Sequence, residues 1–328
     1  MGVFHRHRHE PAGAPESSAR GIWALKVSLA GLLATALLQA AVVALSGSVA
    51  LLADTLHNLA DALTSLPLWI AFRLSRKGRT ARFSYGYHRA EDGAGLAILL
   101  VILASAVWAG YEVISRFLAP ITPSHIPLAM AAAVVGALGN EAVARIRLGV
   151  GREIGSAALV ADGQHARIDA LTSLAAFAGL AGVALGFPLA DPLAGLIITV
   201  AIVAILWDVS RDVLARFMDA IDPELLATLA GLVRRVAGVR DVYDLRARWL
   251  GHRLVAEMTI SVEQSLSLVE GHQIAEEVRH ALLHEIPHLA DVTIHVDPFE
   301  DIPGRYHAIT AHHYPPRPDH DHAHPHGH

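Results

Sequence analysis

The sequence predicts a six-helix transmembrane bundle followed by a small cytoplasmic α+β domain. Three observations predict this fold class: six long apolar stretches before residue 215, an alternation of positive charge between their connections, and a soluble-type composition after about residue 219. Apolar residues make up 53% of the chain and charged residues 17%, whereas soluble domains have about 45–50% and about 25%. The mean hydropathy is +0.41. These values exclude a disordered chain and argue against an ordinary soluble enzyme.

Each apolar stretch is near or above the roughly 20 residues that cross a bilayer as a helix. A buried helix of a soluble protein could account for one such stretch, but not for six in succession. No stretch has the form of a removable signal peptide, so none is expected to be cleaved. The six predicted spans are residues 22–45, 49–72, 93–118, 126–146, 155–187 and 190–206.

The positive charges in the connections predict the orientation. Lys and Arg occur in the N-terminal arm, the second and fourth connections and the exit from the sixth span, but not in the first, third or fifth connection. Because cytoplasmic connections carry the excess of Lys and Arg, both termini are expected in the cytoplasm. The fourth connection is expected to hold Arg145, Arg147 and Arg152. The Ala, Arg and Leu richness favours a bacterial inner membrane as the location.

The region after the last span has the pattern of a small soluble domain. Asp222 and Pro223 predict a helix start that continues to about Val236. Strands are expected over 239–250, 253–262 and 292–296, and a second helix over 268–284. This order suits a ferredoxin-like α+β domain. The predicted organisation is a His-containing cytoplasmic arm (1–20), a transmembrane domain (21–215), a cytoplasmic domain (216–303) and a disordered His-rich tail (304–328).

An internal repeat links the second and fifth spans. Residues 53–66 and 161–174 are identical at nine of fourteen aligned positions. The two copies are three spans apart, so they cross the membrane in opposite directions. Such inverted repeats place binding sites near the middle of the membrane.

The repeat carries a His and an Asp four residues apart in each copy, His57 with Asp61 and His165 with Asp169. This spacing puts both side chains on one helix face. A carboxylate at mid-depth costs roughly 2.5–3.5 kcal/mol on insertion scales, so something must offset it. Two His and two Asp could form a tetrahedral shell around a divalent ion. The alternative is a pair of buried His–Asp hydrogen bonds that only join helices.

Two further acidic residues are repeated, Asp54 and Asp162, each three residues before its His. They could orient the ligands or line an entry path. They could equally make hydrogen bonds between helices.

With two His-x-x-x-Asp motifs on spans two and five and an α+β tail, the chain resembles the cation diffusion facilitator family over about residues 20–300. The resemblance implies a homodimer that exports divalent metal in exchange for protons, with His57, Asp61, His165 and Asp169 as the intramembrane site. His57 favours Zn²⁺, with Cd²⁺, Co²⁺ or Ni²⁺ as alternatives. The chemistry fits antiport, because a ligand His must be neutral and a ligand Asp ionised, so that metal entry expels protons.

The resemblance also implies metal sites outside the membrane. His272, His295 and Asp297 match positions that bind cytoplasmic metal between protomers, and Zn²⁺ is the expected ligand there. Tyr243 and Thr259 occupy two other ligand positions of the family, and His252 or Glu257 could assist. The alternative for these residues is a polar dimer seam.

The second connection contains one more candidate ligand, His88, within the stretch 83–91. Phe83 and Tyr87 stand where some family members carry two His ligands, so His88 is the remaining candidate. The alternative is a structural His in a basic loop. The terminal His runs read as weak metal collectors.

Other functions fit less well. The chain has no Cys, which excludes thiolate metal sites and Cys nucleophiles, and a net charge of −5 argues against nucleic acid as a partner. A membrane metallohydrolase would need an open coordination position and a general base, whereas the repeat supplies four matched ligands. A membrane-anchored metal sensor whose tail reports cytoplasmic metal remains the other alternative.

Overall fold

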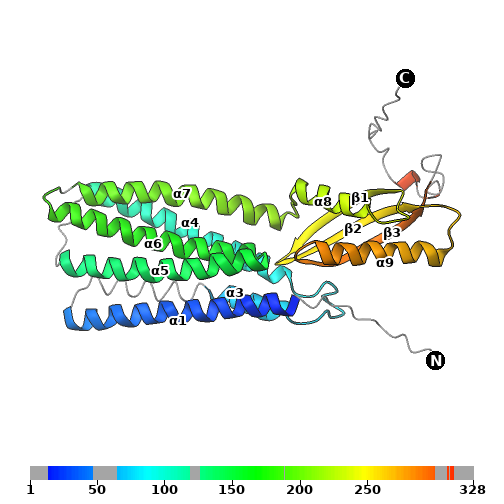
Figure 1. The fold of residues 1–328 in the computed structure, drawn as a ribbon. Coiled ribbons are helices and arrows are strands. Elements are labelled where there is room, and N and C mark those ends of the chain that lie inside the picture. Colours follow the sequence, from blue (N-terminus) through cyan, green and yellow to red (C-terminus); the bar gives the residue numbers. More distant parts are fainter. Residues whose placement is uncertain are drawn as a thin grey trace, which may run out of the picture.

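The computed structural model describes residues 14–46, 65–118, 126–187, 189–299, 309 and 311–313. Figure 1 shows a bundle of long helices with the α+β domain beyond one end of it. The bundle contains α1 (Ala14–Ser46), α3 (Leu66–Ser75), α4 (Arg89–Leu118), α5 (Ile126–Ile154), α6 (Ala157–Ala184) and α7 (Ala190–Phe217). The second domain contains α8 (Pro223–Val233), β1 (Asp241–Leu250), β2 (Arg253–Val262), α9 (Leu268–Glu285) and β3 (Leu289–Pro298).

Among the described residues, five helices are long and apolar enough to cross a membrane, namely α1 and α4 to α7. The shorter apolar helix α3 is the described end of the second predicted span. Residues 47–64, which hold the rest of that span, lie outside the described residues. The predicted fold class, a helical transmembrane domain with an α+β C-terminal domain, is confirmed.

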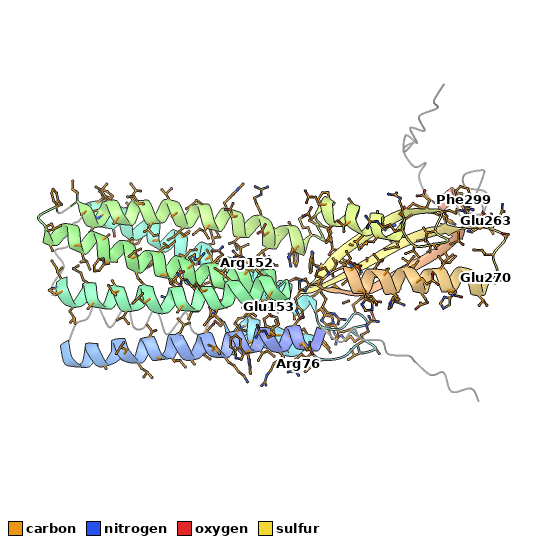
Figure 2. The ribbon with its side chains drawn as sticks, viewed as in Figure 1. Arg76, Arg152, Glu153, Glu263, Glu270 and Phe299 are labelled. Atoms are coloured by element: carbon orange, nitrogen blue, oxygen red, sulfur yellow. The ribbon has the colours of Figure 1, made fainter. Side chains whose placement is uncertain are left out.

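Several helices run further than the apolar stretches that predicted them. Helix α5 continues to Ile154 rather than ending near 146, and α7 continues to Phe217 rather than 206. The expectation that Arg145, Arg147 and Arg152 belong to a connection is therefore wrong, because all three lie within α5. Apolar composition marks the part of a helix that lipid surrounds, and a helix can continue past it. Figure 2 shows Arg152 and Glu153 near the end of the bundle that adjoins the α+β domain.

Helices α5 and α6 approach each other closely beside the repeated motif. An added Cβ at Gly163 would lie 2.9 Å from both the backbone N and the Cγ of Leu148, so only glycine fits there. Small residues permit such close contact between membrane helices. This contact brings the start of α6 against the charged end of α5.

The α+β domain is a three-stranded sheet in the order β1-β2-β3, with β1 and β2 antiparallel and β2 and β3 parallel. Helix α9 starts at a capping box in which the Ser267 hydroxyl and the Glu270 carboxylate each accept from the other's backbone N–H. Side chains of α8, α9 and one face of the sheet form a single apolar core, including Leu229, Ile260 and Val278. Strand β3 is longer at both ends than the predicted 292–296, because only its central residues have an apolar pattern.

Candidate metal centre

Helix α6 carries the described half of the predicted intramembrane site. His165 is 1% exposed and Asp169 is 8% exposed, and Nε2 of His165 lies 3.9 Å from Oδ2 of Asp169. The two residues are eight and twelve positions from the start of α6 at Ala157, about 12 and 18 Å along the helix axis. The spacing of four residues therefore places an imidazole nitrogen and a carboxylate oxygen side by side in the bundle, as predicted.

The other half of this predicted site, His57 and Asp61, lies outside the described residues, as does Asp54. Within the part of the chain that the structure describes, no group of three or more His, Asp or Glu side chains could hold a metal ion. The four-residue site therefore stays a prediction. The positions of His165 and Asp169, two of its four residues, are consistent with it.

Asp162 has a partner that the sequence did not indicate. Arg147 of α5 is 1% exposed, and its Nη1 lies 3.1 Å from Oδ2 of the fully buried Asp162. The other terminal nitrogen of Arg147 donates to the Ser65 hydroxyl at 2.7 Å, next to the start of α3. The guanidinium thus offsets the buried carboxylate and joins α5 and α6 to the end of the second span. The sequence did contain one signal for the burial of Arg147. If the helical pattern of α5 is continued to residue 147, Arg147 falls on the same face as buried residues such as Val143 and Ala144.

The open face of the sheet holds two of the three predicted cytoplasmic ligands. Nε2 of His295 lies 2.9 Å from Oδ1 of Asp297, and the Tyr243 hydroxyl donates to the other oxygen of Asp297. The strand register pairs Tyr243 with Thr259 and Thr259 with His295, so these three positions form one row across three strands. Asp297 is 6% exposed, whereas His295 is accessible.

The remaining candidates for the cytoplasmic domain lie elsewhere. His272 is an exposed residue of α9, which covers the opposite, apolar face of the sheet. His252 lies in the β1–β2 turn, seven residues before Thr259 and therefore about 23 Å along β2 from that row. Glu257 is near the row but lies 3.8 Å from Arg248. Of the candidate cytoplasmic ligands, all of them described residues, only His295 and Asp297 lie side by side within one protomer.

His88 precedes α4 and faces the β1–β2 turn. Its Nε2 accepts a hydrogen bond from Nη1 of Arg253 at 2.9 Å, because a guanidinium can only donate. Burial lowers the pKa of His88 to about 4, and the nearby charges of Arg253, His252 and Arg79 act in the same direction. The imidazole is therefore neutral, with one nitrogen engaged by a cation. The metal role of His88 stays a prediction that would require Arg253 to move.

The terminal His runs fall almost entirely outside the described residues. Of them the structure describes His312 and His313, whose rings lie 3.9 Å apart in the short 3-10 helix η1 (Ala311–His313). Their predicted role in collecting metal stays untested.

Comparison with known protein families assigns the chain to one of them. Residues 25–218 match the model of the cation efflux transmembrane domain, and residues 221–299 match that of the cation efflux protein cytoplasmic domain. The chain belongs to the cation efflux family. Members of this family are membrane transporters of metal ions rather than enzymes, and the second match is to their dimerisation domain.

Relatives of this cation efflux protein come from bacteria and plants. It is 47% identical over 310 residues to the "Probable cation efflux system protein" of Mycobacterium tuberculosis (strain ATCC 25618 / H37Rv), covering 92% of this chain and 93% of the relative. It is 29% identical to the magnetosome protein MamB of Magnetospira sp. (strain QH-2), covering 77% and 87%. Among solved structures, a cadmium form of the MamM C-terminal domain is 29% identical and covers 24% of this chain and 98% of that chain, with a TM-score of 0.23.

Proposed function

We propose that this cation efflux protein exports a divalent metal ion from the cytoplasm in exchange for protons, with Zn²⁺ the first candidate and Cd²⁺, Co²⁺ or Ni²⁺ the alternatives. The ion is held in the membrane by His57, Asp61, His165 and Asp169. The observation that carries the proposal is the buried pair of His165 and Asp169 on α6, together with its inverted copy in the sequence.

The separation within this pair supports zinc coordination. Tetrahedral zinc binds nitrogen and oxygen ligands at about 2.0–2.2 Å, so two ligand atoms on one ion lie roughly 3.3–3.6 Å apart. Nε2 of His165 and Oδ2 of Asp169 are 3.9 Å apart. A small side-chain adjustment therefore suffices for both to bind one ion.

Proton exchange follows from the same ligands. Imidazole must lose its proton to bind metal, and a carboxylate binds only when ionised. Protons arriving from the outer side therefore displace the ion, and metal arriving from the cytoplasm displaces protons. This proposal includes an orientation with both termini in the cytoplasm, consistent with a bacterial inner-membrane protein.

The cytoplasmic domain is proposed to form the homodimer and to bind Zn²⁺ at its open sheet face. His295 and Asp297 would supply ligands from one protomer, and His272 would complete the set at the seam between protomers. The support is the accessible His295 beside a buried carboxylate, and the match to a dimerisation domain.

The test is metal flux into proteoliposomes that contain a zinc-sensitive dye, with an imposed pH gradient. The parent protein is expected to show gradient-driven flux, and Asp169→Asn is expected to lose at least about 90% of it, because the variant removes one ligand charge while keeping the side-chain shape. Asp208→Asn is the matched control, since Asp208 is an exposed carboxylate of α7. Full flux in Asp169→Asn would refute the site, and absent flux in the parent would refute the transport proposal.

A further inference from the structure

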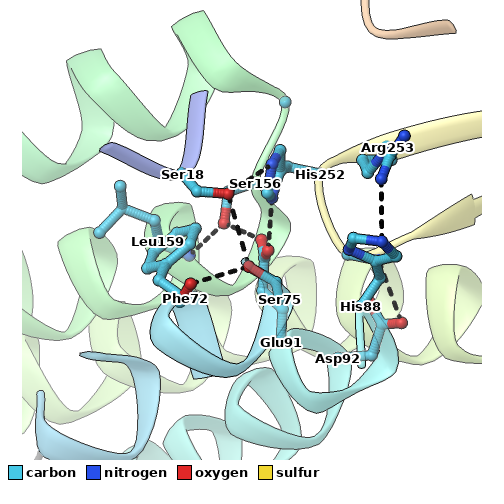
Figure 3. A network of polar contacts seen from close by, with 12 residues as sticks. Ser18, Phe72, Ser75, His88, Glu91, Asp92, Ser156, Leu159, His252 and Arg253 are labelled. Carbon is cyan, nitrogen blue, oxygen red and sulfur yellow. Dashed lines mark hydrogen bonds and ion pairs between the residues drawn. The ribbon is translucent and has the colours of Figure 1, made fainter. Parts of the chain in front are cut away.

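The turn between β1 and β2 inserts into the end of the helical bundle. Figure 3 shows His252 and Arg253 of this turn beside residues of α1, α3, α4 and α6. Gly251 has φ +61°, and its N–H donates to Asp92 of α4 at 3.3 Å. An added Cβ at Gly251 would lie 2.8 Å from a carboxylate oxygen of Glu91 and 2.9 Å from the backbone oxygen of His88. The turn is therefore seated so closely on α4 that only glycine fits.

A buried chain of hydrogen bonds runs from this turn to the start of α6. His252 Nδ1 lies 2.7 Å from one oxygen of Glu91, and the other oxygen accepts from the Ser156 hydroxyl. Ser156 is the N-cap of α6, and its hydroxyl accepts from the backbone N–H of Leu159 at 3.1 Å. His252, Glu91 and Ser156 are 3%, 1% and 0% exposed. A side chain of the cytoplasmic domain thus fixes, through one carboxylate, the first turn of the helix that carries His165 and Asp169.

Contacts on both sides of this chain hold the turn in place. Nε2 of His252 lies 3.3 Å from the Ser18 hydroxyl of α1, and its ring is 5.9 Å from that of Phe72 in α3. Arg216 of α7 donates to the backbone oxygen of Gly155 at 2.7 Å and lies over the ring of Trp249, 4.4 Å from its centre. The β1–β2 turn and its flanks therefore contact α1, α3, α4 and α7, and reach the start of α6 through Glu91.

The orientation of the first turn of α6 determines where the candidate metal ligands lie further along the helix. His165 lies nine residues beyond Ser156, about 14 Å along a rigid helix. A tilt of about 3° at the start of α6 would move this ligand by roughly 0.7 Å, beyond the ~0.2 Å tolerance of metal–ligand distances. Fixing the N-cap therefore fixes the ligands.

We infer that His252 is a positioning residue for metal transport, which acts through Glu91 and Ser156 to hold α6 and its two ligands in place. The inference rests on the proposed function, because it assigns a task to the helix that carries the transport site. It gives the cytoplasmic domain a part in forming the intramembrane site of its own protomer.

The test measures the zinc concentration that gives half-maximal flux in the full-length protein. His252→Leu, Glu91→Gln and Ser156→Ala are each expected to raise it by roughly three- to tenfold, less than the 10–100-fold loss of affinity when a direct partner of a ligand is removed. His252→Asn should retain most of the parental value, because its side-chain amide can donate from near the position of Nδ1. His280→Leu, which changes an exposed His of α9, is the control. A purely structural loss would lower the amount of active protein and leave the half-saturating concentration unchanged.

Double variants test whether the three residues act as one chain. His252→Leu combined with Ser156→Ala should be no worse than either change alone, although the two side chains are joined only through Glu91. Independent structural effects would instead multiply. Unchanged half-saturation in all three single variants, with active parent and inactive Asp169→Asn, would overturn the inference and leave the proposed function standing.

A second readout does not depend on transport. The chain has no native Cys, so Leu138→Cys on α5 and Leu174→Cys on α6, both exposed, can carry a pair of spin labels. His252→Leu should broaden the distance distribution between them, and His252→Asn should not. If the parent showed no flux, the proposed function would fail, while an unbroadened distribution in His252→Leu would refute the positioning role separately. Should His252→Leu fail to fold, Glu91→Gln in the same labelled background decides the question.

Discussion

The buried ion pair of Arg147 and Asp162 lies one helical turn from the candidate ligand His165 on α6. Both side chains are almost fully buried, and they lie 3.1 Å apart. A metal ion that passes this level meets a carboxylate whose charge is already offset by a guanidinium. Asp162 is thus suited to fixing α6 against α5 rather than to binding the cargo, which favours a supporting role over a place in the coordination shell.

Removing one member of this pair should damage the protein more than removing both. Arg147→Gln leaves the Asp162 carboxylate buried without its cation, which costs roughly 3–5 kcal/mol, whereas Arg147→Gln with Asp162→Asn leaves two neutral amides that can bond to each other. The thermal midpoint of the detergent-solubilised protein should fall strongly in the single variant and recover substantially in the double variant. A double variant as unstable as the sum of the single changes would contradict the pairing.

At the scale of elements, the helices and strands with a regular apolar pattern could be predicted, but the ends of the helices that leave the membrane could not. Strand β2 and the start of α9 were predicted at the observed residues, because each has a regular apolar pattern. Helices α5 and α7 run past their predicted ends, because charged residues continue a helix once it leaves the lipid.

The capping box of α9 offers a measurable contribution to stability at this scale. Ser267→Ala removes the hydroxyl that accepts from the Glu270 N–H, and should cost about 0.5–2 kcal/mol. Burial plays no part in this loss, since the cap is exposed. Denaturant unfolding of the full-length protein, followed by a signal from the α+β domain, should show it. Ser265→Ala, two residues earlier and also exposed, should leave the transition within experimental error of the parent.

At the scale of the whole molecule, the residues that join the two domains are those that the sequence did not reveal. The repeat identified His165 and Asp169, because matched motifs can be seen in one chain. Glu91 and His252 are 161 residues apart in sequence, and each alone is an ordinary polar residue near a helix or strand end. Their burial depends on how the domains meet, so no local pattern predicts it.

Two imidazoles at the junction between the domains, those of His88 and His288, should contribute less to stability in acid. Burial lowers the pKa of His88 to about 4, and burial also lowers the pKa of His288, with the charges of His252 and Arg216 adding to the effect. An unfolded or separated chain takes up protons at these imidazoles near pH 6.5, whereas in the assembled junction His88 resists protonation until about pH 4 and the pKa of His288 is also lowered. The contribution of these two imidazoles to stability is therefore fully retained above about pH 6.5 and lost as the pH falls below it.

This pH dependence can be assigned by substitution. His88→Gln cannot take up a proton, so its thermal midpoint should fall less between pH 7 and pH 5 than that of the parent. His284→Gln, which changes an exposed His of α9, should keep the parental slope. Equal slopes in all three proteins would show that acid acts elsewhere in the chain.

The packing of the β1–β2 turn against the end of the helical bundle also has a consequence for biosynthesis. The chain is made from its N-terminus, so α1, α3, α4, α6 and α7 all leave the ribosome before the turn that ties their ends together. Until His252 arrives, Glu91 and Ser156 have only water at one end of their hydrogen-bond chain, and the first turn of α6 is held by its own cap alone. A turn that is synthesised after the helical bundle therefore completes contacts among helices that are synthesised before it, and a chain that ends before residue 252 lacks these contacts.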